Sequence, residues 1–235
     1  MTQLPDSLEA AVVQAKEATR AALADGLLRI QVELVFSELK PMPIARQFLD
    51  LFEDLGEHLK VIFPDAGAAA LASRDWGPQP FAIRSLSEVK GQPQPEDRLF
   101  LLVSPSSVEV SEVEKFSEQV GDRPIIMLNP QLEDAATIGI GYASRQLRIR
   151  FLSTFEPCYY LRPLEQAALL RAYPGSWQVW QELDQEYKLV AEQSHKPVGE
   201  ELDQILFGSP ETPEALKGRE GFFKGLQRFI KALNQ

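Results

Sequence analysis

The chain contains very little cysteine and very little histidine. Among its 235 residues, Cys158 is the one cysteine, and His58 and His195 are the two histidines. A single cysteine excludes an intrachain disulfide, and without a second thiol or a histidine cluster the sequence predicts no metal site. We therefore expect a protein of a reducing compartment that holds neither a metal nor another cofactor.

Long apolar runs are also missing. The sequence has no uninterrupted stretch of about 18 apolar residues, the length that a membrane-spanning helix requires. Its first residues show neither the basic region nor the apolar core of a secretory signal. The expected location is cytoplasmic, with peripheral contact as the only form of membrane association.

The third shortage is positive charge. Lysine and arginine number 24 against 34 acidic residues, for a net charge of -10. Proteins that bind free DNA or RNA need a positive field that replaces phosphate counterions, so no nucleic-acid partner is expected. The apolar content of 44% and the charged content of 25% are ordinary for a folded chain, and the length suits one domain.

Catalytic motifs are scarce as well. Neither histidine lies in a metal-ligand spacing or near a Gly-x-Ser-x-Gly elbow, and no phosphate-binding Gly-x-x-x-x-Gly-Lys segment occurs. The glycine pair in residues 138–141 does not follow a predicted strand, as a dinucleotide fingerprint must. The sequence favours a protein without a catalytic step, and a hydrolase or transferase is the third possibility.

The apolar spacing predicts alternating helices and strands. Helices are predicted at 7–24, 44–55, 66–74, 110–120, 132–143 and 202–206, and strands at 28–34, 59–63, 81–83, 98–103, 124–128, 147–152, 159–161, 168–173, 177–181 and 187–190. This order predicts an α/β fold with a mixed, mainly parallel central sheet, flanking helices and antiparallel C-terminal strands. We expect one domain over residues 1–207, a linker over 208–218 and a terminal amphipathic helix over 219–235.

Polar side chains follow three of the predicted strands. In open α/β sheets, ligands bind outside the carboxyl ends of parallel strands. The candidate ligand-binding residues at these ends are Asp65, Ser106, Ser107 and Asn129. The alternative is that the same side chains only cap helices and turns, and the acidic Asp65 disfavours a phosphate.

An aromatic region in the C-terminal third is the candidate partner-binding surface. Tyr160 and Arg162 lie in a segment dense in aromatic residues, a composition found at the centres of interfaces. Trp177 and Trp180 are three apart, so on a strand they face opposite sides, and at least one is expected to be partly exposed unless both faces of the sheet are covered. Packing in the core explains the same aromatic residues equally well.

The end of the chain is basic and amphipathic. Residues 217–235 contain five basic residues and one acidic residue, a net +4, so residues 1–216 carry -10 - 4 = -14. The apolar face of the predicted helix consists of Phe222, Leu226, Phe229, Ile230 and Leu233, and the opposite face carries Lys224, Arg228 and Lys231. Such a helix contacts an anionic membrane, docks in a partner's groove, or folds back on its own domain.

Four strings of residues resemble a known family. They are residues 62–72, 126–130, 160–164 and 171–179, which occur in matching order within residues 5–192. They are similar to an uncharacterised domain family of cyanobacteria and chloroplasts that includes a plant low photosystem II accumulation protein, an assembly factor, and a domain fused to chloroplast adenylate kinase.

The resemblance implies an auxiliary protein for photosynthetic complexes, with a photosynthetic membrane protein as partner and the thylakoid surface as its place of action. The kinase motifs of the fused proteins are absent here. The fusion suggests the alternative of a small-ligand or nucleotide-binding regulator. The resemblance implies no catalytic residue.

Overall fold

The computed structural model describes residues 3–132 and 142–208. The chain divides into two compact units, each built from separate stretches of sequence. The first unit comprises residues 1–18, 34–39 and 158–235, and the second comprises residues 19–33 and 40–157. Helix α1 (Leu8–Ala24) begins in the first unit and ends in the second. A single domain over residues 1–207 stays a prediction.

The second unit contains parallel strands in the order β3-β2-β4-β5-β1. Every residue of β2 (Leu59–Phe63), β4 (Leu99–Val103) and β5 (Ile125–Leu128) is buried, as their continuous apolar runs predict. β1 (Arg29–Leu34) and β3 (Ala82–Ser85) bury alternate residues. The mainly parallel arrangement expected for this part of the chain is confirmed.

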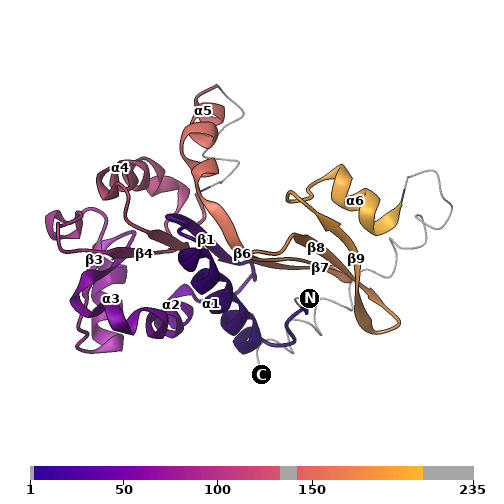
Figure 1. The fold of residues 1–235 in the computed structure, drawn as a ribbon, viewed down its shortest axis with the longest axis horizontal. Coiled ribbons are helices and arrows are strands. Elements are labelled where there is room, and N and C mark those ends of the chain that lie inside the picture. Colours follow the sequence, from indigo (N-terminus) through magenta and orange to yellow (C-terminus); the bar gives the residue numbers. More distant parts are fainter. Residues whose placement is uncertain (1–2, 133–141, 209–235) are drawn as a thin grey trace. The chain divides into compact units, whose positions relative to one another are not determined.

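Helices cover both faces of these parallel strands (Figure 1). α4 (Val110–Val120) lies on one face. There the rings of Phe116 and Phe100 pack edge-on, with their centroids 5.3 Å apart. α2 (Pro41–Phe48) and α3 (Ala66–Trp76) lie on the other. The connecting 3-10 turns span Leu49–His58, Val89–Gly91, Ser107–Glu109 and Leu152–Thr154. Cover on both faces is what allows the central strands to be wholly apolar.

The strand predicted at residues 147–152 is wrong. Helix α5 (Tyr142–Arg150) occupies most of this stretch, and the Phe151 amide donates to the Leu147 carbonyl in a further helical turn. Leu147 and Phe151 are four residues apart, so a helix places both on one side, where they pack on the cluster around Phe116. The alternation of apolar residues at 147–152 by itself fits a strand as well as a helix. Burial of Leu147 and Phe151 on this cluster selects the helix.

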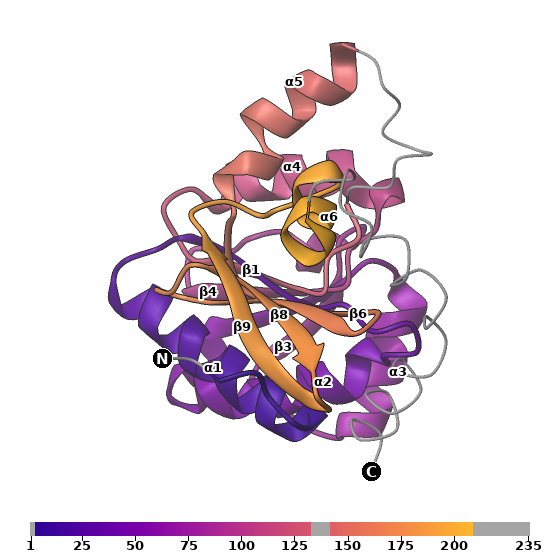
Figure 2. The same cartoon turned by 90° about the vertical axis from the view of Figure 1, so that its right-hand side faces the viewer.

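The first unit holds the antiparallel strands β6 (Glu156–Leu164), β7 (Ala167–Ala172), β8 (Trp177–Leu183) and β9 (Glu186–Gln193), paired in that order. α6 (Glu200–Phe207) packs across one face of them (Figure 2). The contact joins Leu202, Ile205 and Leu206 to a cluster of Tyr160, Leu169, Trp177 and Val179. The predicted antiparallel C-terminal strands and short helix are confirmed.

Small residues of α1 contribute to the core. Ala11 and Ala15 are fully buried, and their spacing places both on one side of the helix. In the first unit, the Tyr159 hydroxyl donates to Gln14 of α1 over 3.3 Å. Burial of this phenol raises its pKa well above the ordinary value, because ionisation would leave a charge away from water.

Several expectations fall outside the described residues. The predicted helix at 132–143 lies there almost entirely, together with the glycine pair in 138–141, and so do residues 209–218 of the linker and the helix predicted at 219–235. Within residues 3–132 and 142–208, no helix has the length and apolar character needed to cross a membrane.

Among the glycines that the structure describes, Gly91 is the one whose replacement we expect to be most costly. A Cβ at this position would come within 2.1 Å of the Ser85 carbonyl oxygen, which belongs to backbone. Gly91→Ala should therefore lower the free energy of unfolding by about 1–3 kcal/mol, measured by urea denaturation. Val89→Ala is the matched control, because Val89 is 86% exposed. Equal stability of the two variants would contradict the close approach.

Candidate functional site

The strand order places a topological switch point between β2 and β4. The chain leaves β2 through α3 toward β3, and it leaves β4 through α4 toward β5, on the other side of the pair. Neighbouring connections that depart in opposite directions open a crevice at the carboxyl ends of the strands, where ligands of α/β proteins bind. The predicted ligand-binding residues follow β2, β4 and β5, so the structure does bring them to one edge.

Two of these side chains have local roles. Asp65 accepts a hydrogen bond from the Ala68 amide at 2.9 Å and caps α3. Ser106 accepts from the Val108 amide at 3.2 Å and donates to Glu109 at 2.6 Å, in a capping box before α4. These contacts agree with the alternative in which the two side chains cap helices. Each side chain can still accept a further hydrogen bond.

Asn129 and Ser104 form the neighbouring part of the same edge. The backbone φ angle is 48° at both residues, an uncommon left-handed conformation for residues other than glycine. The Ser104 amide donates to Leu128, and the Asn129 amide donates to Val32. Ser107 lies just beyond and is 8% exposed.

Ser104 is the residue that sequence reasoning missed. Among the described residues its buried hydroxyl oxygen has no hydrogen-bond partner. A buried hydroxyl without a partner is costly, so this atom is the strongest polar feature of the edge. The signal in the sequence is that Ser104 directly follows a wholly apolar strand. The backbone conformation and the burial of Ser104 are properties of the folded chain.

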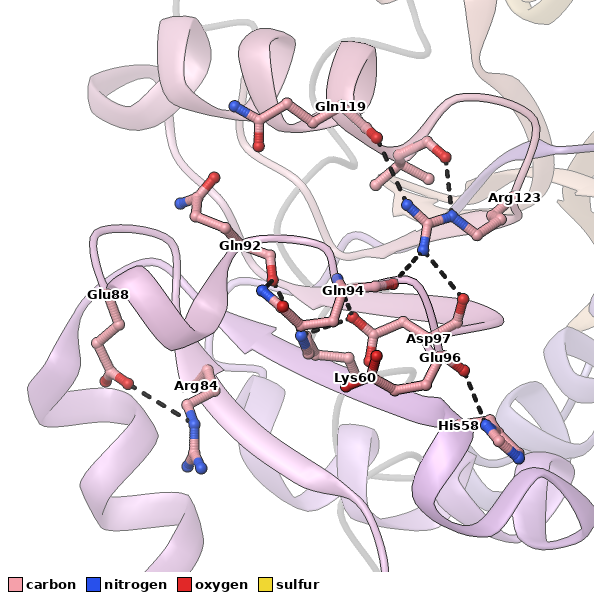
Figure 3. A network of polar contacts seen from close by, with 11 residues as sticks. His58, Lys60, Arg84, Glu88, Gln92, Gln94, Glu96, Asp97, Gln119 and Arg123 are labelled. Carbon is pink, nitrogen blue, oxygen red and sulfur yellow. Dashed lines mark hydrogen bonds and ion pairs between the residues drawn. The ribbon is translucent and has the colours of Figure 1, made fainter.

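At the amino ends of the same strands lies a second polar cluster (Figure 3). The Lys60 ammonium is 2.6 Å from the Asp97 carboxylate, and the two side chains are 3% and 4% exposed. Lys60 also donates to the Gln92 carbonyl, and Asp97 accepts from the Gln94 amide. The pair therefore holds the loop that precedes β4 against β2.

Arg123 completes this amino-edge cluster. Its guanidinium donates to the carbonyls of Gln94 and Asp97 at 2.6 and 3.1 Å, and it lies 5.1 Å from the centre of the Phe100 ring. His58 donates from Nδ1 to the Glu96 carbonyl at 2.8 Å, since a carbonyl only accepts. Each charged group here bonds to the loop, which indicates a structural role rather than a catalytic one.

The predicted partner-binding residues lie in the first unit. Tyr160 and Trp177 are buried with ring centroids 5.2 Å apart, beneath α6 and next to the Lys196 ammonium, which is 3.8 Å from the centre of the Tyr160 ring. Arg162 is exposed. Trp180 is partly exposed, as expected for one of the two tryptophans, and its indole donates to Gln178.

No group of three or more His, Cys, Asp or Glu side chains that would hold a metal ion occurs in the part of the chain that the structure describes. His195 lies 3.0 Å from the carboxylate of Glu201.

A family model of a domain of unknown function, DUF1995, matches residues 5–204. The chain belongs to this family. The DUF1995 match takes in both edges of the parallel strands, β6 to β9 and most of α6, and it ends before the basic segment. No solved structure matches the chain.

The buried ion pair is the contact whose loss we expect to destabilise this DUF1995 domain most. Lys60→Met leaves the Asp97 carboxylate buried without its counter-charge, which costs about 3–5 kcal/mol. Guanidinium denaturation should show this loss, whereas Lys90→Met at an exposed position should show none. A double variant, Lys60→Met with Asp97→Leu, should recover part of the loss. A loss below about 1 kcal/mol for the single variant would contradict the role of the pair.

Proposed function

We propose that this protein is a non-enzymatic auxiliary factor for photosynthetic complexes, similar in role to a photosystem II assembly factor. It acts by contact with a photosynthetic membrane protein or with the thylakoid surface. The observation that carries the proposal is the segregation of charge, +4 in residues 217–235 against -14 in the rest of the chain. The resemblance to a cyanobacterial and chloroplast family supplies the photosynthetic setting.

The basic segment lies beyond the residues that the family model matches. An amphipathic helix with an apolar stripe and a cationic face binds anionic lipid through both features, and each basic residue near the surface contributes about 1 kcal/mol. The acidic remainder of the chain is repelled by the same surface. The segment therefore provides a membrane contact that the domain itself does not favour.

Flotation with anionic lipid vesicles tests this role. The full chain should float, and removal of residues 217–235 should abolish flotation. Charge reversal of Lys224, Arg228 and Lys231 together should weaken binding by at least about a hundredfold, because about 3 kcal/mol of attraction is lost and three repulsive charges are added.

Reversal of Arg74, Lys90 and Lys115 is the matched control for flotation. These residues lie on the exposed surface of the second unit, and their reversal changes the net charge equally. Binding should then fall much less. Equal flotation with and without residues 217–235 would remove the segment from this role.

A second candidate function is a small-ligand or nucleotide-binding regulator. The switch point between β2 and β4 favours it, together with the Ser104 hydroxyl at that edge, which has no hydrogen-bond partner among residues 3–132 and 142–208. The N-termini of the helices that follow the two strands offer backbone amides there, although Asp65 occupies one of them.

Thermal-shift measurements with nucleotides and inorganic phosphate test the second candidate. A ligand at about ten times its Kd adds about 1.4 kcal/mol and should raise the Tm by roughly 3–5 °C. Ser104→Ala should reduce the shift, whereas Ser153→Ala, at an exposed position near the amino end of β1, should leave it unchanged. No rise in Tm at millimolar ligand would exclude nucleotide binding at this edge.

A further inference from the structure

The face of β8 and β9 opposite α6 carries a patch of partly exposed apolar side chains, Trp180, Tyr187 and Leu189, which we call the aromatic patch. Trp180 pairs with Leu189, and Tyr187 pairs with Glu182, two residues along the strand from Trp180. The sheet register shifts at Val179 and Trp180, but both neighbours of Trp180 on β8 face α6: Val179 belongs to the α6 cluster and Gln181 donates to Leu206. Trp180 therefore points to the other face.

Acidic side chains flank the aromatic patch along the strands. At one end Glu182 lies close enough to Tyr187 to help burial raise the tyrosine pKa to about 12. At the other end Glu192 accepts from Gln178, the residue that also accepts from the Trp180 indole. An apolar surface with acidic flanks suits a basic amphipathic helix, since the apolar faces meet and the field of the flanks attracts the positive charge.

The end of α6, after which the basic segment follows in sequence, lies beside β8, one of the two strands that carry the patch. The Gln181 side chain donates to the Leu206 carbonyl at 3.1 Å, which fixes the end of α6 beside β8. β9 is the last strand in the order, so its outer edge is the path from one face to the other. Residues 209–218 reach about 35 Å when extended. A layer of packed sheet is about 10 Å thick, so this length suffices to pass around β9.

We propose that in the free protein the apolar stripe of residues 219–235 docks on the aromatic patch, and that an anionic membrane surface competes for the same stripe. Docking buries Phe222, Leu226 and Phe229 and leaves the basic face outward. The helix then occupies either the patch or the membrane, because both sites use its apolar side. Because only undocked molecules can bind a membrane, the apparent membrane affinity is the intrinsic affinity multiplied by the undocked fraction.

Competition between the patch and a membrane rests on the proposed membrane role. Docking of residues 219–235 on the patch does not depend on that role. The test uses the full chain with p-benzoylphenylalanine in place of Phe229, irradiated without lipid. We expect an intramolecular cross-link to β8 or β9, located by mass spectrometry. The same probe in place of Arg228, on the opposite side of the helix, is the matched control and should give several-fold less of this product.

Variants of the patch link docking to membrane affinity. Trp180→Ala with Leu189→Ala should lower the cross-link yield about tenfold, the change expected when two apolar contacts of about 0.7 kcal/mol each are lost. The same variant should float more readily at limiting lipid. Ile149→Ala, at a position 62% exposed on the second unit, should change neither quantity.

The outcomes separate the two ideas. Cross-links from position 229 to other strands, to a second molecule, or to no protein at all would overturn the docking, even if the wild-type chain floats. Unchanged flotation of the patch variant, together with loss of its cross-link, would overturn the competition. Loss of flotation for the wild type with an intact cross-link would overturn the proposed membrane role and keep the docking.

Discussion

Burial of β2, β4 and β5 on both faces is the constraint on which the second unit depends. A parallel strand with apolar side chains on both faces needs a layer of helices on each side, and each crossover helix provides part of a layer. α3 leads from β2 to β3, and α4 leads from β4 to β5 in the opposite direction along the sheet. The two connections therefore diverge between β2 and β4. The same arrangement that covers the core thus places the topological switch point at the carboxyl edge of β2 and β4.

Polar residues serve the two edges of these strands differently. At the amino edge, Lys60, Asp97 and Arg123 each hydrogen-bond to the backbone of one loop, and Lys60 and Asp97 also pair with each other, so these charged groups all have partners within the fold. At the carboxyl edge, Asp65 and Ser106 cap helices, while Ser104 keeps a buried hydroxyl without a described partner. Buried polar groups are normally paired, and for this reason the proposed small-ligand site is assigned to the carboxyl edge.

The first unit uses its two sheet faces unequally. α6 covers the face that carries Tyr160 and Trp177, so the aromatic residues that looked like an interface contribute to a core. On the other face Trp180, Tyr187 and Leu189 are only partly buried. The hydrogen bond between Gln181 and Leu206 holds the end of α6, after which the basic segment follows in sequence, beside β8. Proximity of a chain end to an apolar patch raises its effective concentration there, whatever else it binds.

Local sequence patterns determined the helices and strands over most of the described chain. The apolar runs at 59–63 and 124–128, the Asp65 cap and the glycines that end helices act over a few residues, so spacing alone is enough to read them. Residues 147–152 show the limit of this reading, since only packing of Leu147 and Phe151 on a distant cluster selects helix over strand. Strand order, the switch point, the conformation of Ser104 and the choice of which tryptophan is buried were decided by tertiary structure alone, because each depends on contacts between residues far apart in the chain.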